Sequence, residues 1–351
     1  MNGNLKHVLV IRLSALGDVA MTVPVLLAFK AANPGVKITV VTRGTYIPIF
    51  KAIPEVATFS VNTKGRHRGV WGLFKLAREL KSVNPTAIAD LHNVLRTQIL
   101  RIFLIGSETP FQTIDKGRTA KRRLTRSKNK VWQPLRSTHD RYADVFVRLG
   151  FNIALLSGKY MLPAQPWPER FKGNLAGLKI GIAPFATHQG KCYPEELMQR
   201  VIEEFQHKTS LVMYLFGGGT LETDKLSAWA SQYSNCRNVA GRLSLAEELA
   251  IISNLDLMIS MDSGNGHLAA MFGVPVITLW GVTHPFAGFA PYGQPESHAL
   301  LADRNQFPNI PTSVYGNRTP EGYEKAIAGI LPEQVVKLAL QILGPAAVEN
   351  K

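Results

Sequence analysis

Three short polar segments of the sequence contain the residue types that could do chemistry on a bound substrate. The first is Leu16-Gly17-Asp18, the second runs from Ala183 to Lys191, and the third runs from Asp262 to His267. A carboxylate such as Asp18 can accept a proton from a hydroxyl group. A lysine, and backbone N–H groups left bare at a helix start, can bind phosphate oxygens. The three segments therefore indicate a proton acceptor and an anion site.

Each polar segment directly follows an apolar run that is typical of a buried strand. These runs are Lys6–Leu13, Lys179–Ala183 and Leu257–Met261. Apolar residues at helical spacing come after the polar segments, and strands that alternate with helices predict right-handed βαβ units. Ligands of open parallel sheets bind beyond the carboxyl ends of the strands. We therefore expect all three segments to lie where a substrate can reach them.

The first segment is compatible with two roles for Asp18. Its carboxylate could act on a substrate hydroxyl, or it could cap the helix that follows, since acidic residues are stabilised at a helix start. No G-x-G-x-x-G motif opens either half of the chain. The glycine-rich fingerprint of dinucleotide-binding proteins is therefore absent, which disfavours a dehydrogenase.

The second and third segments offer donors for a diphosphate. Thr187 and Lys191 could contact its oxygens, although a lysine in such a loop can equally be an ordinary surface residue. Gly264 and Gly266 would let an anion approach the backbone amides as far as His267. The alternative for the third segment is an ordinary turn between strand and helix, with a half-buried histidine.

Positive charge is concentrated in one part of the chain. The net charge is +15, and eight of the basic residues fall between Lys116 and Lys130 with no acidic residue among them. Such a block attracts phosphate of nucleic acid, of anionic lipid or of a phosphorylated substrate, unless it is simply a solvated loop. The block contains no aromatic residue for base stacking, so we do not expect a nucleic-acid partner.

Length and composition predict two domains, and the apolar runs and amphipathic stretches that alternate in both halves favour the α/β class. The 351 residues are 46% hydrophobic, which is enough for two cores. A Pro- and Gly-bearing stretch at 163–178 has no periodicity and predicts a boundary that divides 1–165 from 166–330, with a terminal helix in 331–351. We expect neither a signal peptide nor a membrane-spanning helix. Cys192 and Cys236 fit neither a disulfide framework nor a metal site, which favours the cytoplasm.

The ordered segments resemble glycosyltransferase family 9, which includes the bacterial lipopolysaccharide heptosyltransferases. The resemblance covers nearly the whole chain and includes Arg12–Val19, Phe216–Gly218, Gly241–Glu247 and Trp280–Pro285. It implies a GT-B fold, in which two Rossmann-like domains with parallel sheets face a cleft. The acceptor would bind to the N-terminal domain and the nucleotide sugar to the C-terminal domain, and the terminal helix would cross back to the N-terminal domain.

The resemblance also implies roles for individual residues. Asp18 would be the general base of an inverting displacement. Donor-binding residues would be Thr187, Lys191, Glu222, Asp262, Ser263, Gly264, Asn265, Gly266 and His267. Acceptor-binding residues would be Ser14, Gly17, Lys116, Arg118, Lys121, Arg122 and Arg123. Glu222 would bind ribose hydroxyls, although an ordinary surface glutamate is an equal alternative.

The implied reaction moves a heptose from an ADP-linked donor onto a phosphorylated lipid A-type acceptor during lipopolysaccharide core synthesis. The chain has no D-x-D motif, so the transfer is expected to need neither a metal nor a cofactor. The basic block would hold the enzyme at the anionic inner face of the inner membrane, as a peripheral cytoplasmic protein. A different ADP-, UDP- or GDP-linked sugar stays open, as does a sugar-nucleotide epimerase or hydrolase on the same scaffold.

Overall fold

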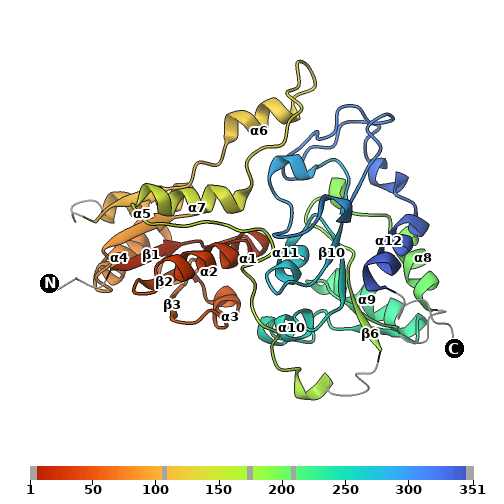
Figure 1. Cartoon of the computed structure of the whole chain (residues 1–351), viewed down its shortest axis with the longest axis horizontal. Helices are drawn as coiled ribbons and strands as arrows, with labels where there is room; N and C mark the ends of the chain where they lie inside the picture. Colours follow the sequence, from red (N-terminus) through yellow and green to blue (C-terminus); the bar gives the residue numbers. More distant parts are fainter. Residues whose placement is uncertain (1–5, 105–108, 172–176, 207–210, 345–351) are drawn as a thin grey trace. The chain divides into compact units, whose positions relative to one another are not determined.

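The computed structural model describes residues 6–104, 109–171, 177–206 and 211–344. The chain divides into two compact units (Figure 1). Unit 1 comprises Met1–Lys116 and Thr138–Leu162, and unit 2 comprises Gly117–Ser137 and Pro163–Lys351. The chain passes between the units three times, and the third passage, from Leu162 to Pro163, lies at the edge of the boundary that the sequence predicts. Residues 117–137, which we call the excursion, belong to unit 2 although the chain before and after them belongs to unit 1. This differs from the prediction, which placed 117–137 in the N-terminal domain.

Unit 1 is built on a five-stranded sheet in which all neighbouring strands are parallel. Its strands are β1 (His7–Ile11), β2 (Lys37–Arg43), β3 (Val56–Val61), β4 (Ala87–Asp90) and β5 (Phe111–Thr113). They lie in the order β3-β2-β1-β4-β5, so β1 is central. Val8 to Ile11 are fully buried because neighbours and helices cover a central parallel strand on both faces.

The helices of unit 1 pack their apolar stripes against this sheet. They are α1 (Leu16–Ala20), α2 (Thr22–Ala32), α3 (Ile47–Phe50), α4 (Gly69–Lys81), α5 (Leu95–Leu104) and α7 (Thr138–Arg148). In α4 the buried residues Leu73, Leu76, Ala77 and Leu80 recur at helical spacing and share one core cluster with Leu9 of β1. Helix α7 packs on α2 and so ties the returning chain to unit 1.

Unit 2 contains a six-stranded sheet, again with all neighbouring strands parallel. The strands are β6 (Leu178–Ala183), β7 (Leu211–Leu215), β8 (Cys236–Asn238), β9 (Leu257–Met261), β10 (Val276–Trp280) and β11 (Ala299–Leu301). Their order is β11-β10-β9-β6-β7-β8. The two parallel sheets with connecting helices confirm the predicted α/β class with two Rossmann-like domains.

The helices of unit 2 are α6 (Arg118–Thr125), α8 (Glu195–Gln206), α9 (Thr220–Gln232), α10 (Leu245–Ile252), α11 (Gly264–Ala270) and α12 (Pro332–Leu343). Helix α12 packs on α8, and its buried residues Val335, Val336 and Ala339 join the core of this unit. The structure therefore groups α12 with unit 2, where the sequence predicts a helix that crosses back to the N-terminal domain. The apolar stripe that predicts this helix says nothing about which core receives it.

The excursion of 117–137 is fixed to unit 2 by backbone acceptors far away in the sequence. The Lys130 ammonium donates to the carbonyl oxygens of Asn309 (2.9 Å) and Pro311 (2.8 Å). The Leu135 amide donates to the carbonyl oxygen of Phe286 at 2.9 Å. Because backbone acceptors leave no pattern in side-chain types, the sequence alone could not reveal this attachment.

In the described part of the chain, no helix combines the length and apolar character needed to cross a membrane.

Polar side chains fix the turn that ends β4 in unit 1. The buried Asp90 carboxylate accepts hydrogen bonds from the backbone N–H groups of His92 (2.9 Å) and Asn93 (3.0 Å). Asn93 has a φ of 46°, in the left-handed region that asparagine tolerates. Burial, followed by the positive charge of Arg12, lowers the pKa of His92 to about 3. The imidazole is therefore neutral in the folded protein near pH 7.

This lowered pKa makes folding sensitive to acid. Below about pH 6.5 the unfolded chain protonates His92 while the folded protein does not, so the free energy of unfolding falls as the pH drops towards 3. We expect wild type to lose about 1.4 kcal/mol per pH unit more than His92→Gln between pH 6 and pH 4. Urea denaturation of both proteins across this range measures the difference. Parallel pH profiles of the two proteins would contradict a neutral His92.

Candidate functional site

Asp18 lies in the first turn of α1, at the end of β1. Its Oδ2 pairs with the Arg12 guanidinium at 2.6 Å and accepts a hydrogen bond from the Ala15 amide at 3.4 Å. The second contact is long, so the capping role foreseen from the sequence is present but weak. The Asp18 side chain is 30% exposed, whereas that of Arg12 is 7% exposed. Asp18 is therefore accessible while a buried cation holds its carboxylate in place.

Arg12 and Tyr142 position Asp18. The Arg12 guanidinium donates to the carbonyl oxygen of Leu91 at 2.7 Å and lies over the Tyr142 ring, 5.7 Å from its centroid. The Tyr142 hydroxyl donates to the backbone carbonyl of Asp18 at 3.2 Å. Neither residue has a role predicted from the sequence. Arg12 could have been found, since it directly precedes the polar loop, but Tyr142 lies on α7 and offered no signal.

Two of the predicted acceptor residues lie beside Asp18. Ser14 and Gly17 belong to the same loop and first helical turn, and both are partly exposed. The Ser14 hydroxyl oxygen is 3.5 Å from Nε2 of His92, which follows β4. Strands β1 and β4 are neighbours in the sheet, so their carboxyl ends bring these loops together. This corner of unit 1 therefore offers a carboxylate, a hydroxyl and a neutral imidazole.

Lys191 and Asp262 form the central contact of the predicted donor site. The Lys191 ammonium is 3.1 Å from Oδ2 of Asp262, and the Thr283 hydroxyl donates to the same oxygen at 2.9 Å. Lys191 ends the 3-10 turn η3 (Gln189–Lys191) after β6, and Asp262 follows β9. Strands β6 and β9 are paired, so the second and third polar segments meet at one sheet edge. Thr283, which had no predicted role, completes the contact.

The surrounding backbone holds Lys191 closely. The Val282 amide donates to the carbonyl oxygen of Gly190 at 3.0 Å, which ties η3 to the segment after β10. Gly316 lies against the aliphatic part of Lys191, where an added Cβ would come within 2.4 Å of that side chain. Gly316 also has a φ of 82°, which favours glycine. Lys191 is thus a fixed cation and not the mobile surface lysine of the alternative interpretation.

The third segment divides into an accessible part and a buried part. Ser263, Gly264 and Asn265 are partly exposed at the start of α11, whereas Gly266 and His267 are buried. A Cβ on Gly266 would meet the Ser260 hydroxyl at 3.3 Å, so this glycine serves the packing of α11 on β9. The sequence predicts that Gly266 lets an anion approach the backbone closely. In the structure only the first residues of the helix are partly exposed, where backbone N–H groups have no acceptor within the helix.

Thr187 and Glu222 lie at the same carboxyl edge of the sheet, after β6 and β7. Thr187 is exposed, and the structure places it on the loop that leads to Lys191. Glu222 stands in the first turn of α9 and accepts a hydrogen bond from the Gly218 amide at 2.8 Å. This glutamate is therefore neither a free surface residue nor a member of the Lys191 cluster. Its carboxylate orders the glycine turn after β7.

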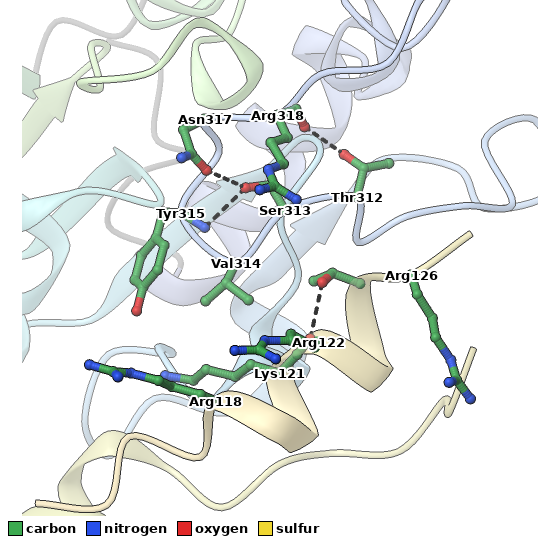
Figure 2. A pocket seen from close by; sticks show the side chains of 11 residues that line it. Arg118, Lys121, Arg122, Arg126, Thr312, Ser313, Val314, Tyr315, Asn317 and Arg318 are labelled. Atoms are coloured by element: carbon green, nitrogen blue, oxygen red, sulfur yellow. Dashed lines mark hydrogen bonds between the residues drawn. The ribbon is translucent and has the colours of Figure 1, made fainter. Parts of the chain in front are cut away.

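A basic pocket of about 540 Å³ forms between α6 and a loop near the end of unit 2. Figure 2 shows the side chains of α6 facing those of the loop. The lining residues are Arg118, Lys121, Arg122, Thr125, Arg126, Thr312, Ser313, Val314, Tyr315, Asn317 and Arg318. Three predicted acceptor residues therefore line it. Arg123 lies on the same helix outside the lining, and Lys116 belongs to unit 1.

Hydrogen bonds within the loop give the pocket a fixed wall. The Ser313 hydroxyl donates to the Asn317 side chain at 2.9 Å and accepts from the Gly316 amide at 3.0 Å. The Thr312 hydroxyl donates to the carbonyl oxygen of Arg318 at 2.9 Å (Figure 2). Arg318 has no role predicted from the sequence, since it stands outside any cluster of charge. Arg318 stands about 200 residues after α6 in the sequence and adds its cation to the cations of that helix in the pocket.

Lys130 belongs to the basic block of the sequence but has a structural role. Its ammonium donates to three carbonyl oxygens, those of Leu124, Asn309 and Pro311. Burial, and then the positive charge of Arg304, lowers its pKa to about 8. A lysine with three acceptors has used all its N–H groups. The basic block therefore combines cations that face a pocket with one that anchors the segment.

Comparison with known proteins places this chain among glycosyltransferases. The family model described as glycosyltransferase family 9 (heptosyltransferase) matches residues 73–315, more than half of the chain. Lipopolysaccharide heptosyltransferase 1 of Pseudomonas aeruginosa is 26% identical over 306 residues, which cover 83% of each protein. Lipopolysaccharide heptosyltransferase 3 of Escherichia coli is 24% identical and covers 76% of this chain and 80% of its own length.

Solved structures agree on the fold. A glycosyltransferase family 9 protein from Veillonella parvula has a TM-score of 0.73 at 22% identity over 98% of both chains. The E. coli heptosyltransferase WaaC, solved with ADP, has a TM-score of 0.66 at 18% identity over 97% of this chain and 99% of its own. The same enzyme has also been solved with ADP-2-deoxy-2-fluoro heptose. With a matching family model over most of its length, this chain belongs to glycosyltransferase family 9.

Proposed function

We propose that this glycosyltransferase moves a heptose from ADP-heptose onto a phosphorylated, lipid-linked saccharide in lipopolysaccharide core synthesis. The fixed Lys191–Asp262 contact at the carboxyl edge of the unit 2 sheet is the observation that carries the donor side. The choice of donor rests on the relative WaaC, which was solved with ADP and with a fluorinated ADP-heptose. The choice of acceptor rests on the relatives that act in lipopolysaccharide synthesis and on the basic pocket.

The chemistry of donor binding follows from the charges around Lys191. An ammonium has three N–H groups, so Lys191 can keep Asp262 and still bind a phosphate oxygen. The backbone N–H groups of the partly exposed residues at the start of α11 add donors of the kind that helix N-termini offer to anions. When the sugar leaves, negative charge builds up on the nucleoside diphosphate, and these fixed donors stabilise it. We therefore propose a transfer that needs no metal ion.

Asp18 is the proposed general base. Its described contacts with Arg12 and Ala15 both use Oδ2, so we assign Oδ1 to the acceptor hydroxyl. The hydroxyl proton passes to Oδ1 while the hydroxyl oxygen bonds to the anomeric carbon of the donor. The bond between that carbon and the phosphate oxygen breaks, and its electron pair leaves with the diphosphate. A single displacement of this kind inverts the anomeric configuration.

The basic pocket is the proposed site for acceptor phosphate. The pocket contains Arg118, Lys121, Arg122, Arg126 and Arg318, and no acidic side chain lines it. Guanidinium groups bind phosphate in a bidentate manner, and several of them together tolerate more than one phosphate. The same positive surface favours an anionic lipid bilayer, which supports a peripheral location at the inner face of the inner membrane.

Replacement of Asp18 tests the base. We expect Asp18→Asn to lower kcat by roughly 100- to 10,000-fold, because an amide cannot accept the proton, while the Kd for ADP stays unchanged. Mass spectrometry of the acceptor after incubation with ADP-heptose and EDTA measures transfer. Asp224→Asn, on the exposed surface of α9, is the matched control and should transfer normally. Normal transfer by Asp18→Asn would exclude this residue as the base, and donor turnover without acceptor would favour the epimerase or hydrolase.

Replacement of Lys191 tests the donor site. Loss of a charge-assisted hydrogen bond costs about 1.5–3 kcal/mol, so Lys191→Ala should raise the Kd for ADP by roughly 10- to 100-fold. Isothermal titration calorimetry with ADP gives the Kd directly. Lys225→Ala removes an exposed lysine that pairs with Glu195 on the surface and should leave the Kd as in wild type. Equal Kd values for all three proteins would place the diphosphate elsewhere.

Charge reversal in the basic pocket tests the acceptor side. We expect Arg122→Glu and Arg318→Glu each to raise the KM for a phosphorylated acceptor by at least about 10-fold and to reduce its dependence on salt, because each replaces a phosphate-binding cation with a carboxylate. Arg123→Glu changes the same charge on α6 outside the pocket and is the matched control. If all three variants change KM equally, the effect is one of net charge, and the pocket is not the phosphate site.

A further inference from the structure

Large apolar side chains are exposed on helices α4 and α5, which pack on one another in unit 1 (Figure 1). Trp71 is 79% exposed and Val70 58%, and on α5 Ile102 is 66% exposed. The Trp71 ring meets the Phe74 ring edge-on at 6.1 Å between centroids, and Phe74 meets Phe103 of α5 in the same way at 5.7 Å. These five side chains form one surface across both helices, which we call the α4–α5 patch.

The α4–α5 patch is separate from the apolar stripes that the two helices bury. Leu73, Leu76 and Leu80 of α4 and Leu100 of α5 belong to the core cluster of unit 1. A helix at the surface of a soluble domain normally carries polar residues opposite such a stripe. Contiguous exposed apolar side chains on a folded domain are typical of a binding surface. The core of unit 1 therefore does not explain the patch.

Positive charge accompanies the patch. The two helices contain one acidic residue, Glu79, and five basic residues, which are Lys75, Arg78, Lys81, Arg96 and Arg101. The Glu79 carboxylate is already bound by Arg66 at 2.5 Å and by Nε2 of His67 at 3.2 Å. Lys75 and Arg78 are exposed and form no ion pair with any described residue. The charge left available on this face is therefore positive.

An anionic lipid surface matches both properties of this face. Tryptophan and other apolar side chains enter the boundary between head groups and acyl chains, while lysine and arginine meet lipid phosphates. A second copy of the chain is a poorer match. A two-fold contact would place Lys75 and Arg78 of one copy against the same cations of the other, and like charges in one interface repel.

We propose that the α4–α5 patch is the surface by which this protein binds an anionic phospholipid bilayer. Its apolar side chains enter the interface, and the cations of the two helices lie among the lipid phosphates. The inference rests on the peripheral location in the proposed function and names the surface responsible for it. The basic pocket of unit 2 is then free to hold the acceptor phosphate.

Trp71 reports its own insertion, because bromine on a lipid acyl chain quenches tryptophan fluorescence on contact. The probe is a vesicle of phosphatidylglycerol and dibrominated phosphatidylcholine in equal parts, compared with the same vesicle without bromine and with no substrate present. We expect quenching in wild type that disappears in Trp71→Phe, which still binds because phenylalanine keeps an apolar ring. Quenching that persists in Trp71→Phe would place the lipid at another tryptophan, such as Trp132 of the excursion, and would overturn the proposal.

The other face of the unit 1 sheet provides matched controls. The connection from β1 to β2 and that from β3 to β4 run in opposite directions across the sheet, so right-handed crossovers put α2 and α4 on opposite faces. Helix α7, which packs on α2, exposes Val147 to 53%. Lys51 is exposed just after α3, whose connection from β2 to β3 runs in the same direction as that of α2.

Substitutions test the apolar and the charged parts separately. We expect Ile102→Gln and Lys75→Glu each to raise the lipid concentration for half-maximal binding at least about 5-fold in vesicle co-sedimentation. Val147→Gln and Lys51→Glu make the same changes on the other face and should bind as wild type does. Equal losses in all four variants would overturn the patch as the binding surface. A change of oligomeric state in Ile102→Gln without a change in vesicle binding would assign the patch to a second copy.

Transfer assays separate this inference from the proposed function. Ile102→Gln should act as wild type does on a phosphorylated acceptor whose acyl chains have been removed, and more slowly on the complete acceptor in vesicles. Loss of vesicle binding by wild type, with transfer to the soluble acceptor intact, would overturn the patch and leave the proposed function standing. Vesicle binding through the patch without any transfer would support the patch and contradict the proposed function.

Discussion

Parallel strand pairing is the constraint on which the chemistry of each unit depends. Parallel strands end at the same edge of a sheet, so loops that are distant in sequence are brought together there. In unit 1 this edge joins the loop after β1, with Asp18, to the turn after β4, with His92. In unit 2 it joins the loops after β6, β9 and β10, which supply Lys191, Asp262 and Thr283. The helices mainly keep these strands buried and their order fixed.

An ion pair lies at each of these edges, and the two pairs differ in which partner is the more buried. In unit 1 the cation Arg12 is the more buried member, and the carboxylate of Asp18 is left accessible. In unit 2 the carboxylate of Asp262 is 8% exposed and holds Lys191, which is 15% exposed. Buried ion pairs contribute little net stability, because desolvation offsets the attraction. Their value here is orientation: the buried partner fixes the accessible one, a base in unit 1 and a phosphate-binding cation in unit 2.

The sequence was informative wherever function depends on residues close together in the chain. The three polar segments and their strands could be predicted, because buried parallel strands are continuous apolar runs and the polar loops follow them directly. Tyr142 and Arg318 could not be predicted, since Tyr142 contacts Asp18 across 124 positions of the chain and Arg318 lines one pocket with the distant residues of α6. The packing role of Gly266 was also hidden, because a glycine that avoids a clash and one that admits an anion look the same in sequence.

The excursion of 117–137 shows how one anchored segment can shape two pockets of unit 2. Its helix α6 supplies most of the cations of the basic pocket, and its Trp132 and Pro134 line a second pocket of unit 2, beside β10. Lys130 lies between these two parts and donates to three carbonyl oxygens, two of them in the segment at 309–311. Although burial lowers its pKa to about 8, the ammonium stays charged at neutral pH, where its three N–H groups match the three acceptors. Lys130 therefore fixes the walls of both pockets, and all its N–H groups are used by backbone carbonyl oxygens. Phosphate binding is left to the arginines of α6 and to Arg318.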